Sequence, residues 1–84
     1  MGDVAIFPNP ANEYIDIDLK KYEGKNVNLY VYNQLGKLMQ VVKVEKVNST
    51  LQRFDTQSFI AGSYFIRIQA SGVREVTKQF KIAK

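Results

Sequence analysis

The 84-residue sequence contains no cysteine and no histidine. Without cysteine there is no disulfide framework, no thiolate metal ligand and no thiol nucleophile. Without histidine there is no imidazole ligand or general base, which excludes most hydrolase chemistry. The composition therefore predicts a protein that is not an enzyme, with no catalytic, cofactor-binding or metal-binding residues.

Long apolar runs are also missing. No run approaches the roughly 20 residues that a membrane-spanning helix needs, and the N-terminus lacks the basic and apolar regions of a signal peptide. We therefore expect no membrane insertion by this chain itself. We expect residues 1–3 to be an expression scar or linker remnant, because the strand-like sequence begins at Val4, and residues 4–84 to form one domain.

Charge is distributed unevenly along the chain. The net charge is +4; residues 1–42 hold four Lys/Arg against five Asp/Glu, and residues 43–84 hold eight against three. A basic half favours acidic partners through long-range steering without identifying one. A hydrophobic content of 45% is that of an ordinary globular domain, and at this length the core will be thin.

Alternation of apolar and polar residues dominates the sequence. Residues 13–19 alternate so that Ile15, Ile17 and Leu19 face inward, the period of a half-buried strand. No segment repeats its apolar residues at helical spacing, and turn signals recur every 8–12 residues. The pattern predicts an all-β fold, a single Greek-key-like antiparallel β-sandwich of about seven strands. The further strands are expected at residues 4–7, 27–32, 37–47, 51–54, 64–68 and 73–82, of which 51–54 is either an edge strand or a crossing between sheets.

Tyr64 has a distinctive setting. The spacing Phe59-x-x-Gly62-x-Tyr64 before a strand resembles the tyrosine corner of Greek-key sandwiches, in which the hydroxyl bonds upstream backbone. We expect its partner within residues 55–61; the alternative is an ordinary aromatic strand residue.

Two clusters could bind ligands but have simpler interpretations. Glu13, Asp16 and Asp18 are oxygen ligands of the kind that calcium takes, but a strand provides no loop to wrap an ion, so we expect a solvated strand face. Three tyrosines near lysines could stack on nucleic acid or sugar, but cross-strand aromatic pairing explains them more simply, and we expect no nucleic-acid partner. These tyrosines are Tyr14, Tyr30 and Tyr32.

The closing segment combines apolar and basic residues. Val76, Phe80 and Ile82 are expected in the core. Lys78, Lys81 and Lys84, with solvated ammonium groups, either protect an edge strand from aggregation or take part in recognition. Both readings hold together if a partner adds the edge to its own sheet.

Four blocks in order carry a resemblance to a known family. They are residues 6–12 with Phe7-Pro8-Asn9-Pro10, residues 27–38 with the Gly36 turn, residues 55–68 with Ala61-Gly62-Ser63-Tyr64-Phe65, and residues 78–82. The chain resembles the type A C-terminal sorting domain of the type IX secretion system, the Por secretion tail family. The positions that carry the family motif are Pro8, Asn9, Pro10, Gly36, Ala61, Gly62 and Tyr64.

The resemblance implies a C-terminal secretion signal fused to an N-terminal cargo. It implies export to the periplasm, recognition by an outer-membrane translocon, and removal by a sortase-like peptidase, with the cargo then at the cell surface or secreted. The translocon is expected to read Lys78, Phe80, Lys81, Ile82 and Lys84. The alternative is a fibronectin-like adhesion or carbohydrate-binding accessory module without catalytic activity.

Overall fold

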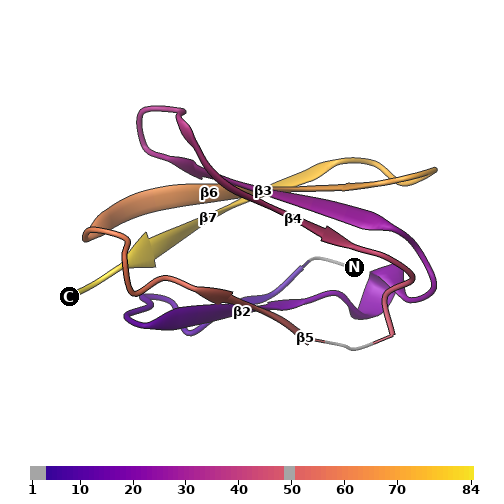
Figure 1. The fold of residues 1–84 in the computed structure, drawn as a ribbon, viewed down its shortest axis with the longest axis horizontal. Coiled ribbons are helices and arrows are strands. Elements are labelled where there is room, and N and C mark those ends of the chain that lie inside the picture. The colour runs from indigo at the N-terminus through magenta and orange to yellow at the C-terminus, as the bar shows by residue number, and fades with distance from the viewer. Residues whose placement is uncertain (1–3, 49–50) are drawn as a thin grey trace.

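Strands account for most of the computed structural model, which describes residues 4–48 and 51–84 (Figure 1). The predicted scar at residues 1–3 lies outside the described residues. The elements are β1 (Ile6–Phe7), β2 (Tyr14–Asp18), the short 3-10 helix η1 (Lys20–Tyr22), β3 (Val27–Asn33), β4 (Leu38–Val44), β5 (Leu51–Asp55), β6 (Gly62–Ala70) and β7 (Val76–Ile82).

The strands form two sheets that lie over one another in Figure 1. One sheet has the order β1-β2-β5 and the other the order β4-β3-β6-β7, and neighbouring strands are antiparallel throughout. The chain changes sheet after β2, after β4 and after β5. The prediction of an all-β sandwich of about seven strands is confirmed, and the ambiguous segment at 51–54 is an edge strand of the smaller sheet.

The core lies between the sheets and follows the predicted alternation. Successive side chains of a strand point to opposite faces, so an apolar–polar alternation with a period of two buries one face and leaves the other in solvent. Each inward residue predicted within residues 13–19 is at most 1% exposed. The fully buried large side chains include Tyr22, Phe80, Ile15, Ile17, Leu19, Leu29, Ile66 and Ile68.

β7 shows one departure from the expected pattern. Val76, Lys78 and Phe80 are spaced by two, so all three face the core side of the sheet, and Lys78 is half-buried there. Only Lys81 of the two strand lysines lies on the outer face. Because β7 is an edge strand of its sheet, one side of its backbone is not paired within the sheet.

Candidate functional site

The first and last segments of the domain meet along the outer edge of β7. The Ala11 amide donates to the Lys81 carbonyl (2.8 Å), and the Ala83 amide donates to the Ala11 carbonyl (2.7 Å). The Lys81 amide donates to Oδ1 of Asn9 at 3.2 Å. Ala11 and Ile82 form a parallel bridge. We call this contact, residues 9–11 against residues 81–83, the terminal clip.

The sequence explains why the chain makes this contact. Pro8 and Pro10 fix φ near −65° and restrict the residues before them, so the chain leaves β1 as a stiff link, which bends at residues 8–10. The link carries the chain from the three-stranded sheet to the edge of the other sheet. Ala11 is 1% exposed, and its small side chain lets the two backbones approach.

Lys84 closes the same end of the sandwich. Its Nζ donates to the carbonyls of Thr56 (3.0 Å) and Gln57 (2.6 Å). Lys84 is exposed, and the loop after β5 turns these two carbonyls toward its ammonium group, a contact that the sequence did not indicate. Thr56 is fully buried, and its hydroxyl donates to the Asn12 carbonyl at 3.2 Å.

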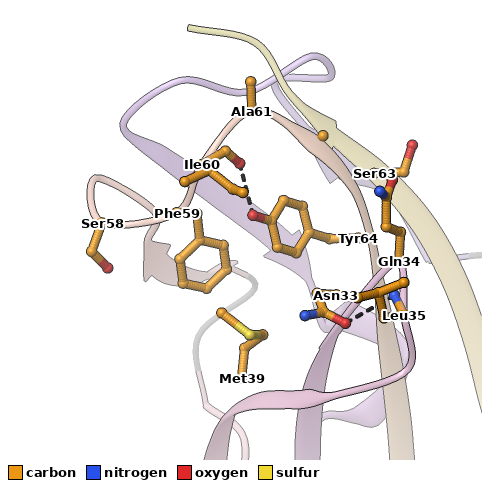
Figure 2. Close-up of a pocket in the computed structure, with 11 residues that line it drawn as sticks. Asn33, Gln34, Leu35, Met39, Ser58, Phe59, Ile60, Ala61, Ser63 and Tyr64 are labelled. Atoms are coloured by element: carbon orange, nitrogen blue, oxygen red, sulfur yellow. Dashed lines mark hydrogen bonds between the residues drawn. The ribbon is translucent and has the colours of Figure 1, made fainter.

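Tyr64 anchors the loop that precedes β6 (Figure 2). Its hydroxyl donates to the Ile60 carbonyl at 2.7 Å, inside the 55–61 range in which the partner was expected. The Tyr64 ring lies between Phe59, at a centroid distance of 5.0 Å, and Phe80, at 5.7 Å. The ring thus links the loop to the inner face of β7.

A small pocket separates this loop from the β3–β4 turn (Figure 2). In the turn, Oδ1 of Asn33 accepts the amides of Leu35 and Lys37, both at 2.9 Å. The pocket holds about 270 Å³, slightly less than the range of about 300–1,000 Å³ that is usual for small-molecule sites. Leu35 and Ile60 beside it are 87% and 79% exposed.

A family model described as "Secretion system C-terminal sorting domain" matches residues 5–83. The chain belongs to this family of type IX secretion sorting domains. The match includes both halves of the terminal clip. No curated protein matches the chain. As a sorting domain, the chain is a C-terminal secretion signal, which implies export toward the cell surface or the exterior, and the domains of this family are in general not catalytic.

The residues of the sorting domain that the translocon is expected to recognise differ in their exposure to solvent. Phe80 and Ile82 are 1% and 3% exposed, so their side chains hold β7 in the core. Lys81 is exposed on the outer face, and Lys78 lines a groove beside β7. Sequence reasoning missed Thr56 and Ala11, which hold the two ends of the sorting domain together.

The acidic cluster in the sorting domain is not a fully solvated face. Asp16 is 5% exposed, and its carboxylate accepts two hydrogen bonds from Arg53, at 2.8 and 3.0 Å. These hydrogen bonds lower the pKa of Asp16 and outweigh its desolvation. The described residues include no cluster of three His, Cys, Asp or Glu side chains suited to a metal ion.

The tyrosines of the sorting domain face arginines rather than one another. Arg53 lies 3.9 Å from the ring centroid of Tyr14, and Arg67 lies 4.8 and 5.6 Å from those of Tyr30 and Tyr32. Cation–π contacts occupy one face of each of these rings, and of the three tyrosines Tyr32 alone stands opposite an aromatic residue, Phe65, on the neighbouring strand. In the described part of the chain, no helix is long and apolar enough to cross a membrane.

Proposed function

We propose that this sorting domain takes a fused N-terminal cargo from the periplasm to an outer-membrane translocon, and that a sortase-like peptidase then removes the domain. The cargo is thereby released or left at the cell surface. The terminal clip is the observation that supports this best. It joins the opening family motif, next to the cargo junction, to the closing strand, so that one end of the sandwich presents both as a single surface.

Within this surface we assign the direct contact with the translocon to the basic side chains of β7. Lys81 is exposed, whereas Phe80 and Ile82 act by keeping the strand in place. Lys84 contributes by fixing the chain end to the loop after β5. The domain needs no cofactor for this role, because a sorting signal is recognised by its shape and charge.

The segment that contains Pro8 and Pro10 serves the proposed processing step. The pairing of β1 with β2 and the stiff link that follows β1 fix where the chain enters the folded domain, so a peptidase that binds the domain finds the junction at a defined place. In this proposal the peptidase cuts upstream of β1 and leaves the sandwich intact.

The test is a reporter with a signal peptide at its N-terminus and this domain at its C-terminus, expressed in a cell that has type IX machinery. We expect surface delivery of the reporter with the domain and periplasmic retention without it. Lys81→Glu should reduce delivery, because reversed charge is penalised at a complementary interface.

Lys37→Glu is the matched control, since Lys37 is an exposed lysine in the β3–β4 turn. It makes the same change of charge away from β7 and should leave delivery unchanged. Retention of the wild-type reporter in the periplasm would contradict the proposed function. Equal loss in both variants would contradict the assignment to Lys81.

A further inference from the structure

The backbone of β7 is covered along only part of its outer edge. The amide and carbonyl of Lys81 point away from β6, because they bond Asn9 and Ala11 in the terminal clip. In an antiparallel strand, alternate residues point their amide and carbonyl groups to the same side. Thr77 and Gln79 therefore also point these groups outward, and no other described residue hydrogen-bonds to them.

The route of the N-terminal segment explains why this stretch is left open. Ala11 forms a single parallel bridge with Ile82 on the edge of β7. The preceding residues do not continue it, because the chain turns away to join β1 to β2 in the other sheet. Pro10 and Pro8 have no amide hydrogen, so they cannot extend the ladder toward Gln79.

A groove runs between the open stretch of β7 and the start of the chain. Val4 is buried and Ile6 half-buried there, which gives the groove an apolar part. None of the described residues that line it is acidic. The lining residues are Val4, Ala5, Ile6, Asn9, Lys78 and Gln79.

These features fit an extended peptide rather than a compact ligand. An added strand satisfies outward amides and carbonyls through its own backbone, and its alternate side chains supply specificity. Side chains on one side of such a strand would meet the apolar part of the groove. Carboxylates on such a strand would be attracted by Lys81, which is exposed on the outer face of β7 beside the open stretch.

We propose that an extended, acidic segment of the sorting machinery adds to the four-stranded sheet at Thr77 and Gln79, as a further strand beside β7. The inference rests on the proposed function and specifies how the translocon reads this edge. The terminal clip fixes where the added strand ends, because residues 81–83 are already paired.

Gln79→Pro tests the proposal in the reporter described above. Proline removes the outward amide of Gln79 while the ladder to β6 is kept, and edge strands tolerate it there. We expect surface delivery to fall about tenfold or more, because both a hydrogen bond and close backbone contact with the added strand are lost.

Val41→Pro is the matched control on the opposite edge of the same sheet. The Asn33 amide donates to the Lys37 carbonyl, so the odd-numbered residues of β3 direct their amides and carbonyls toward β4. Val41 pairs with the even-numbered Tyr30, and its own amide therefore points away from β3. Val41 is 43% exposed. We expect this variant to be delivered like the wild type, and circular dichroism of both purified variants to show the folded β-sandwich.

Hydrogen exchange on the 84-residue domain gives a readout that is independent of export. We expect fast exchange of the Thr77 and Gln79 amides and slower exchange of the Lys81 and Ala83 amides. Equal protection of these four amides from exchange would contradict the claim that the backbone edge at Thr77 and Gln79 is unpaired.

The failures of the two proposals are distinguishable. Normal delivery of a folded Gln79→Pro variant overturns strand addition, while delivery of the wild type upholds the sorting function. Equal loss in Gln79→Pro and Val41→Pro also overturns strand addition, because the effect would not be specific to β7. Retention of the wild-type reporter overturns the sorting function itself.

Discussion

On the outer face of each sheet an arginine lies close to a carboxylate and to a tyrosine. The arginine–carboxylate contact is closer on the three-stranded sheet than on the four-stranded sheet. On the three-stranded sheet, Arg53 makes two hydrogen bonds to Asp16 and stacks on Tyr14. On the four-stranded sheet, Nε of Arg67 stays 3.6 Å from Glu75, and the described residues offer this atom no hydrogen bond.

Register accounts for the difference. Asp16 of β2 stands directly opposite Arg53 of β5. Arg67 of β6 stands opposite Thr77 of β7, and Glu75 precedes β7, so this carboxylate is not directly opposite the arginine. The comparison indicates that a cross-strand ion pair stabilises the three-stranded sheet, which we call the short sheet. In the four-stranded sheet, called the long sheet, the arginine mainly covers aromatic rings.

The largest expected effect comes from breaking the core under the long sheet. Phe80→Ala should lower the free energy of unfolding by about 3–5 kcal/mol, because the ring is 1% exposed and packs on Tyr64. Urea denaturation followed by circular dichroism measures this loss. Ile60→Ala removes an apolar side chain that is 79% exposed and should change stability by less than about 0.5 kcal/mol. Similar losses in the two variants would contradict the position of Phe80 in the core.

The next effect concerns the tight ion pair of the short sheet. Asp16→Asn should cost about 1–1.5 kcal/mol at pH 7, the lower end for hydrogen bonds between charged groups, since the Arg53 side chain is 62% exposed.

The pH dependence of this effect follows from the lowered pKa of Asp16. A carboxylate with a lowered pKa in the folded state stabilises the protein above its ordinary pKa of about 4, and the contribution is lost as pH falls through the folded pKa. Urea midpoints of wild type and Asp16→Asn should therefore differ constantly above about pH 5 and converge in acid. A pH-independent difference would contradict the role of the ion pair.

A smaller effect is expected at the loop that enters the long sheet. Tyr64→Phe removes the hydrogen bond to the Ile60 carbonyl and keeps the ring between its aromatic neighbours. The cost should be about 1 kcal/mol or slightly less, because the carbonyl belongs to an exposed residue and can bind water instead. An unchanged urea midpoint would show that Tyr64 acts through its ring alone.

The smallest effect is expected at the loose pair of the long sheet. Glu75→Gln should change the free energy of unfolding by less than about 0.5 kcal/mol at pH 7, since both side chains are more than a third exposed. The same urea series, run beside Asp16→Asn, compares the two sheets directly. An equal cost for the two substitutions would remove the distinction drawn between them.

Periodicity within a strand made much of the fold predictable. The inward positions of β2 and β3 follow from alternation alone, because the period of two is local. The same spacing places Lys78 between Val76 and Phe80 on the core side of β7, although its residue type suggests the solvent side.

Long-range partners could not be predicted in the same way. Asp16 and Arg53 lie 37 residues apart, and Asn9 and Lys81 lie 72 apart. Lys84 finds its carbonyl partners in a loop 27 and 28 residues away. Such pairs depend on sheet order, which many strand arrangements with the same alternation would satisfy.

The terminal clip has a consequence for the timing of folding. Ala11 can make its hydrogen bonds only when residues 81–83 are present, so its pairing waits for almost the whole domain to be synthesised. Contacts of such large sequence separation form slowly and late. The edge of β7 is thus completed last, and a chain that stops before residue 81 leaves the N-terminal link without its partner.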